Sequence, residues 1–221
     1  MRWTVGFAFF AMAWSWGCTT ESSSKPVGSD AKITNEVATV LDTNQVINFA
    51  AGIVLQSQGA LIQSLVGALE RGGYVEAVDH CHLQASSLTD SLERSMGVRV
   101  RRLTDRPLNP DNRASGDAAA YIENARKQVE LGALPMQVEP AMFSNSDASA
   151  HRVFFPIGTH DMCVKCHGHL GTDIVPDVWA ALMARYPADE VHGFGPNDLR
   201  GIWEITVPAD GVPARAWPTG F

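Results

Sequence analysis

Basic residues are scarce in this sequence, and the shortage argues against one class of partner. The 221 residues include 24 acidic and 17 basic side chains, which gives a formal net charge of −7 at pH 7. Binding to nucleic acid requires a basic face that neutralises phosphates, so we expect no nucleic-acid partner. The chain also lacks an internal repeat, a glycine-rich phosphate-binding loop and a hydrolase triad signature. The sequence therefore does not favour a repeat protein, a nucleotide-binding protein or a triad hydrolase.

Charged residues are few as well, at 19% of the chain, whereas hydrophobic residues make up 45%. These fractions are ordinary for a globular protein and argue against disorder over most of the length. A chain of 221 residues is long enough to bury one real hydrophobic core. We therefore expect a single folded domain, over residues 35–221.

The first 17 residues are not expected to belong to that domain. Arg2 precedes an apolar run that is too short to span a bilayer comfortably, and a small residue, Gly17, ends it. This arrangement is typical of a secretory signal peptide. Cys18 resembles the lipid-modified cysteine of bacterial lipoproteins, and the polar stretch 18–34 then serves as a tether. We expect a periplasmic, membrane-anchored lipoprotein, and an ordinary cleaved signal is the alternative.

Apolar spacing predicts helices first and strands later. A helical pattern without proline covers 35–69, Gly72 and Gly73 interrupt it, and a second helix is expected over 74–96 with Gly97 as its stop. Alternation and turn signals predict the remaining elements: strands over 98–103, 135–143, 151–158 and 200–207, and helices over 117–131 (with Ser115 as its cap) and 176–186. This order indicates an α+β domain, with a small antiparallel sheet against the N-terminal helices.

The chain has only four cysteines, and their number constrains their roles. Cysteines of exported proteins usually pair as disulfides. If Cys18 carries lipid, the three others are Cys81, Cys163 and Cys166. An odd number means that at least one of them does something other than form an internal disulfide.

The segment CVKCH, residues 163–167, has the C-x-x-C-H spacing of covalent haem attachment. Two thiols bond to one haem, and the adjacent His167 becomes an axial ligand of the iron. A redox disulfide would be expected in a βαβ context, and a zinc site needs further ligand pairs, neither of which the sequence offers. We expect one covalently attached haem c, held by Cys163 and Cys166.

The second axial ligand is less apparent from the residues alone. His160, Met162 and His169 flank the motif, while His80, Cys81 and His82 lie together on the helix expected over 74–96. At about 100° per residue, Cys81 falls near the centre of an apolar face, whereas His80 points away and His82 lies on the flank. The alternative is a small core residue, because free cysteine is often buried. These observations leave both roles for Cys81 open.

Four stretches make residues 61–207 similar to a known family: EAVDHCHLQA, GVRVRRLTDRPLNPDN, DMCVKCHG and RYPADEVHGFGPNDLRG. They resemble single c-type haem domains with a PAS-like fold, known from cyanobacteria and from sensor modules of bacterial histidine kinases. The resemblance implies a PAS-like sheet and axial ligation by His167 and Cys81. It also favours Arg102, which matches a family position, over Arg101 as a partner of the haem propionates. The alternative is that these arginines are solvated charges at a strand edge, where alternation turns only one of the two inward.

Ligation by a thiolate suggests two functions of different classes. An anionic ligand favours ferric iron and a low reduction potential, and reduction would make Cys81 replaceable. We therefore expect a redox or diatomic-gas sensor that acts through an unknown signalling or redox partner, with a homodimer through the N-terminal helix as one route. The alternative is a membrane-tethered electron carrier of low potential. We expect no enzyme, because both axial positions are filled and no acid–base pair is evident.

Overall fold

The computed structural model describes residues 42–145, 148–186 and 192–210, all of which belong to one compact unit, Thr39–Phe221. The expected signal peptide, the lipid-anchor residue Cys18 and the tether 18–34 lie outside the described residues. The expected start of the first helix, near residue 35, lies outside them too.

Helix α1 (Thr43–Met96) begins and ends where the sequence indicates helix-terminating chemistry. The carboxylate of Asp42 accepts a hydrogen bond from the backbone N–H of Asn44, at 3.2 Å, and so caps the first turn. Gly72 and Gly73 leave the helical conformation, the second of them with a φ of 68°, so α1 consists of two consecutive helices. Gly97 ends α1 with a φ of 66°, a left-handed conformation that glycine adopts without strain. The predicted break and the predicted stop are both confirmed.

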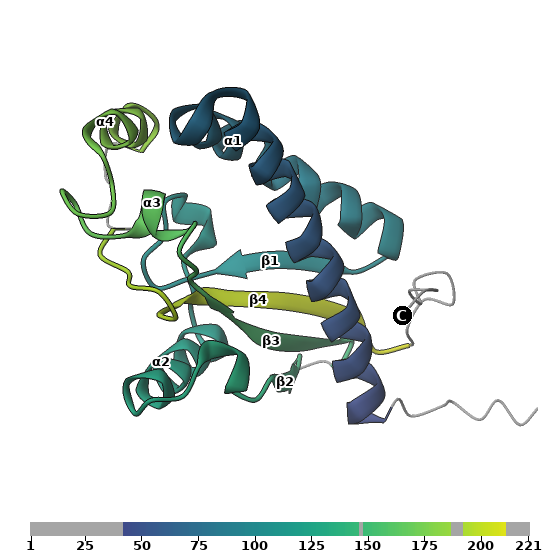
Figure 1. Ribbon diagram of the computed structural model, residues 1–221. Helices are drawn as coiled ribbons and strands as arrows, with labels where there is room; N and C mark the ends of the chain where they lie inside the picture. Colours follow the sequence, from purple (N-terminus) through teal and green to yellow (C-terminus); the bar gives the residue numbers. More distant parts are fainter. Residues whose placement is uncertain (1–41, 146–147, 187–191, 211–221) are drawn as a thin grey trace, which may run out of the picture. The chain divides into compact units, whose positions relative to one another are not determined.

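Four antiparallel strands form one sheet in the order β1-β4-β3-β2. Their bounds are β1 Arg99–Leu103, β2 Ala141–Ser144, β3 Ala150–Gly158 and β4 Leu199–Pro208. The α+β class and the small antiparallel sheet are therefore confirmed (Figure 1). The strand expected over 135–143 is shorter than predicted, because Pro135 opens a 3₁₀ turn, η2 (Pro135–Gln137), and pairing starts only after Pro140.

Shorter helices connect the strands. They are η1 (Pro110–Asn112), α2 (Asp117–Glu130), α3 (Val164–His167) and α4 (Pro176–Arg185). Ser115 does not cap α2, contrary to expectation. Gly116 occupies the capping position with a φ of 56° and makes no side-chain cap. A side chain there would be strained. Helix α2 nevertheless begins at Asp117, as predicted.

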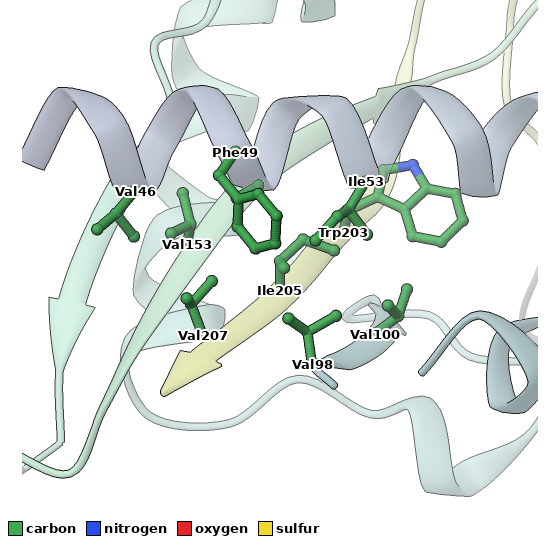
Figure 2. Close-up of a cluster of buried hydrophobic side chains, with 10 residues drawn as sticks. Val46, Phe49, Ile53, Val98, Val100, Val153, Trp203, Ile205 and Val207 are labelled. Carbon is green, nitrogen blue, oxygen red and sulfur yellow. The ribbon is translucent and has the colours of Figure 1, made fainter. Parts of the chain in front are cut away.

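The sheet is covered by α1 on one face and α2 on the other. Figure 2 shows Phe49 and Ile53 of α1 packed over Val153 of β3 and Ile205 of β4. Burying each such side chain contributes about 1.5–3 kcal/mol. The opposite face packs against α2 through a second buried group: Leu103, Ala118, Tyr121, Ile122, Ala125, Val138, Phe154, Leu199 and Ile202. Adjacent residues of one strand therefore face different helices.

The stretch Thr43–His82 of α1 is also long and apolar enough, by length and composition, to cross a membrane. Part of it is core, since Val46 and Phe49 are fully buried against the sheet. Other apolar side chains of the same stretch are exposed, with Leu55 at 61%. The first half of α1 thus has one face in the core and a second apolar face that the described residues leave uncovered.

Candidate functional site

The C-x-x-C-H motif forms a single helical turn, α3, with Cys163 directly before it. The carbonyl of Cys163 accepts hydrogen bonds from the N–H groups of Cys166, at 3.1 Å, and His167, at 2.9 Å. Residues three apart on a helix lie on the same side, so this turn presents Cys163 and Cys166 together. Val164 is buried and anchors the opposite side. The local fold thus gives the motif the geometry that its spacing implies.

Backbone contacts from a distant segment hold this turn in place. Phe194 donates its N–H to the carbonyl of His167, at 3.0 Å, and Gly193 donates to the carbonyl of Gly168, at 2.6 Å. A Cβ at Gly168 would lie 2.4 Å from the carbonyl oxygen of Val164, closer than real Cβ contacts. The chain can therefore fold this tightly after His167 only with glycine at 168.

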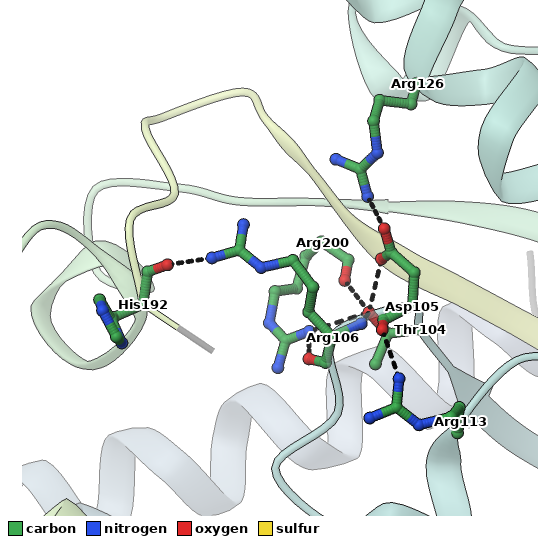
Figure 3. A network of polar contacts seen from close by, with 7 residues as sticks. All are labelled: Thr104, Asp105, Arg106, Arg113, Arg126, His192 and Arg200. Carbon is green, nitrogen blue, oxygen red and sulfur yellow. Dashed lines mark hydrogen bonds and ion pairs between the residues drawn. The ribbon is translucent and has the colours of Figure 1, made fainter. Parts of the chain in front are cut away.

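A network around Thr104 positions the 193–194 segment in turn (Figure 3). Arg106 donates to the carbonyl of His192, and its guanidinium lies 4.4 Å from the ring centroid of Phe194. Arg200 lies over the same ring at 5.1 Å, and Thr104 donates to the carbonyl of Arg200 at 2.8 Å. The network also includes Asp105, Arg113 and Arg126. The loop after β1 thereby fixes the backbone that carries His167.

The second half of α1 packs on α4 through a small apolar cluster beside the cysteines. Its buried members are Val78, Ile174, Val178 and Leu182. Cys166 is half-buried against this group, which places one motif cysteine next to α1. An ion pair between Asp79 and Arg185, at 2.7 Å, ties the same two helices at the surface.

Cys81 lies one turn beyond Val78 on α1 and is exposed. This differs from the expectation of a continuous apolar face, because Val75 is also exposed, whereas Val78 is buried. The alternative role of Cys81 as a buried core residue is not what the structure shows. Cys81 lies near enough to Arg102 and Cys166 for each to feel its charge. The structure thus brings Cys81 toward the motif from about eighty residues upstream in the sequence.

The histidines beside Cys81 face other elements. His80 is hydrogen-bonded through Nε2 to Oγ of Ser64, at 2.6 Å, and through Nδ1 to Arg71, at 3.3 Å. It therefore points toward the first half of α1. The ring of His82 contacts the ring of Tyr186 edge-on, with centroids 5.2 Å apart.

The residues that flank the C-x-x-C-H motif make contacts with their neighbours in the sequence. His169 is exposed and interacts through both its N–H and its ring with the carboxylate of Asp173, at 2.8 and 3.3 Å. The carbonyl of His160 accepts a hydrogen bond from the N–H of Cys163, at 2.8 Å, and thereby starts the turn that leads into α3. Met162, in the same turn, is half-buried.

Strand alternation separates the two neighbouring arginines of β1, as predicted. Arg102 lies opposite Trp203 of β4, and Trp203 packs on the α1 face of the sheet. Arg101 lies opposite Glu204 on the other face and donates to the carbonyl of Asp111, at 2.9 Å. Arg102 is thus the arginine on the side of Cys81.

Electrostatics at the site favour the protonated forms of Cys81 and Cys166. Crowding by neighbouring protein atoms raises the pKa of Cys81, although the residue is exposed as a whole, and the positive charge of Arg102 partly offsets this. Burial raises the pKa of Cys166 to about 12, and nearby Cys81 and Cys163 add to the shift. Burial lowers the pKa of Arg102, which the negative charge of a Cys81 thiolate opposes. Cys81 of α1, Arg102 of β1 and Cys166 of α3 therefore influence one another's protonation.

Sequence reasoning missed the part played by Arg106, Phe194 and Arg200. Their stretches stood out as family-like segments, but only the folded chain shows that they support the backbone at His167. In the described ranges, no three or more His, Cys, Asp or Glu side chains form a group that could hold a metal ion by themselves.

Fold and site define an α+β protein in which a C-x-x-C-H turn lies close to a cysteine on a long helix. The sequence profile of the Tll0287-like family matches residues 22–208, and the chain belongs to this family. The crystal structure of the cyanobacterial haem protein Tll0287 is similar, with a TM-score of 0.50 and 19% identity over 76% of this chain and 97% of that one. That likeness shows a shared fold. No curated protein matches the chain.

Proposed function

We propose that this protein binds one haem c covalently through Cys163 and Cys166, with His167 and Cys81 as the axial ligands of the iron. The observation that carries the proposal is the placement of Cys81 near Cys166, within reach of its charge and on a separate helix. Membership of the Tll0287-like family supports it, because Tll0287 is itself a haem protein.

The residues present fit such a group. Two cysteines stand on one side of a helical turn, a histidine follows directly, and the apolar cluster of α1 and α4 adjoins them. Arg102 offers a cation for a propionate on the same side of the sheet. Formation of each thioether would add the S–H of a motif cysteine across a vinyl group, a step that needs no oxidant. When bound, haem would supply a one-electron redox centre.

Sensing is the function that this arrangement supports best. Cys81 belongs to the half of α1 that begins at the Gly72–Gly73 break, so a change at Cys81 acts on a helix segment that can reorient about two glycines. Because a thiolate binds ferric iron more strongly than ferrous iron, Cys81 would dissociate from the iron on reduction. The first half of α1 packs on the sheet and would pass the change to a partner protein of redox or signalling type.

An electron carrier of low potential is the second candidate. The net charge of −7 and the proposed tether at Cys18 suit a membrane-anchored periplasmic carrier as well. A carrier would keep both axial ligands on reduction, because rearrangement slows electron exchange. We expect no enzymatic activity in either case, since His167 and Cys81 would both ligate the iron in the resting, ferric protein.

A pyridine haemochrome spectrum of the exported full chain tests haem attachment. We expect a c-type band from the wild-type protein and from His169→Gln, whose exposed ring contacts Asp173. The double variant Cys163→Ser, Cys166→Ser should lose covalent haem on denaturing gels. A wild-type chain without a c-type band would overturn the proposal.

A further inference from the structure

A pocket on the opposite side of the sheet from Cys81 is lined by four arginines. It is open to solvent and has a volume of about 370 Å³, between β1, β3, β4 and the start of α2. Arg99 and Arg101 enter it from β1, Arg152 from β3, and Arg113 from the loop before α2. The pocket lies on the α2 face of the sheet, whereas Arg102 lies on the α1 face. It is therefore separate from the proposed haem site.

Positive charge exceeds negative charge within this pocket, in a chain that is acidic as a whole. One carboxylate lines it, that of Glu204, and its nearest arginine nitrogen belongs to Arg152 at 3.8 Å. Arg152 also pairs with Asp117 at the start of α2. Both of these acids thus pair with Arg152, and neither lies within ion-pair distance of Arg99 or Arg101. A chain with a net charge of −7 has no general surplus of arginine that would explain this concentration.

Arg99 and Arg101 have no acidic partner among the described residues, which leaves their charges available. Arg101 donates to the carbonyl of Asp111, at 2.9 Å, and Arg113 donates to the carbonyl of Asp105, at 3.0 Å. Arg99 pairs with Thr206 of β4 through the backbone, while its side chain has no hydrogen-bond or ion-pair partner among the described residues. The Nε of Arg152 is buried without a hydrogen-bond partner among the described residues. Each guanidinium has five donors, so several N–H groups remain to bind a ligand.

Neutral polar groups complete the lining. The side chains of Ser115, Asn145 and Thr206 face the same space and offer further hydrogen bonds. Ser115 lines this pocket, whereas the sequence predicted it to cap α2. The volume falls near the lower end of the range for small-molecule sites, which begins at about 300 Å³. A folded partner domain would not enter such a space, whereas a small organic molecule fits.

We propose that this pocket binds a small organic anion bearing at least two carboxylate or phosphate groups. Planar guanidinium groups match the two oxygens of a carboxylate or phosphate in a bidentate fashion, and a second anionic group would balance the remaining charge. The ligand occupies the space between β1 and α2 and neutralises repulsion among the arginines. Binding is therefore expected to stabilise the fold as well.

Calorimetric titration and thermal unfolding of the full chain test this site, with citrate as the carboxylate probe and pyrophosphate as the phosphate probe. Sodium chloride at matched ionic strength is the control for screening. We expect one or both probes to bind and to raise the unfolding temperature beyond the effect of chloride. Which of the two binds more tightly identifies the anionic group. Equal effects of the probes and of chloride would overturn the proposal.

Charge-neutral variants locate the binding. Arg99→Gln removes a guanidinium that makes no bond within the described chain, and Arg101→Gln removes one held by a carbonyl. Each should weaken binding about tenfold, the worth of one hydrogen bond to a charged group. Arg94→Gln removes an equal charge from the exposed end of α1 and should leave affinity unchanged. Equal losses in Arg94→Gln and Arg99→Gln would show non-specific attraction and sink the idea.

Discussion

Cys81 illustrates how one exposed side chain can be chemically distinctive. Cysteine in a surface position ordinarily has a pKa close to that of the free thiol, but crowding by neighbouring atoms raises the pKa of Cys81. The positive charge of Arg102 opposes this rise. Anything that stabilises the thiolate, such as ferric iron, must therefore overcome the local cost of charge.

Replacing Cys81 tests its proposed role as a ligand. In Cys81→Ser the iron would lose its thiolate, so the ferric electronic and EPR spectra should change. The midpoint potential should rise by on the order of 100 mV, since each 59 mV corresponds to a tenfold preference for one oxidation state. His82→Gln is the matched control, because His82 is adjacent but contacts Tyr186. Unchanged spectra and potential in Cys81→Ser would exclude Cys81 as a ligand.

At the scale of elements, α3 is a single turn that cannot hold its own conformation. Isolated helices of this length are unstable in water. The turn is maintained by the N–H groups of Gly193 and Phe194, and those are fixed by Arg106 from the loop after β1. The position of His167 therefore depends on residues about sixty places away in the sequence.

A methyl group at Gly168 should disturb this arrangement. In Gly168→Ala the new Cβ would meet the Val164 carbonyl and the Asp173 side chain, at 2.4 and 2.6 Å. Relief of such overpacking costs about 1–3 kcal/mol, so we expect a lower unfolding temperature and less covalent haem per chain. Gly59→Ala is the control, because nothing lies within 4 Å of its added Cβ. A Gly168→Ala protein with wild-type stability and haem content would contradict the account of α3.

The sequence predicted those elements whose limits are set by local chemistry. Gly72, Gly73 and Gly97 mark helix breaks because the backbone there takes conformations that other residues avoid. The strand order was not predictable in the same way, since pairing of β1 with β4 joins segments about a hundred residues apart. The exposure of Cys81 and the support by Arg106 depend on packing between elements, which helical periodicity does not encode.

At the scale of the whole molecule, the two halves of α1 have different surroundings. The first half buries Val46, Phe49 and Ile53 against the sheet, while the second packs on α4 and carries Cys81. Leu55 and Ile62, seven residues apart, are exposed on the first half. Residues at this spacing lie on one side of a helix, and such an apolar stripe is what a helix pairing with a second copy requires. The homodimer through this helix therefore stays a prediction.

Binding of carbon monoxide distinguishes the sensor from the carrier. In the sensor, reduction releases Cys81, so the dithionite-reduced protein should bind CO and show the corresponding shift of its absorption bands. Amide hydrogens of the helix segment after Gly73 should then exchange faster than in the ferric protein, because that segment loses its tie to the iron. Amides of β4, whose side chains are mostly buried in the sheet, should exchange equally in both states and serve as the internal control. If the reduced protein instead excludes CO and its exchange pattern is unaltered, Cys81 stays bound and the protein is a carrier.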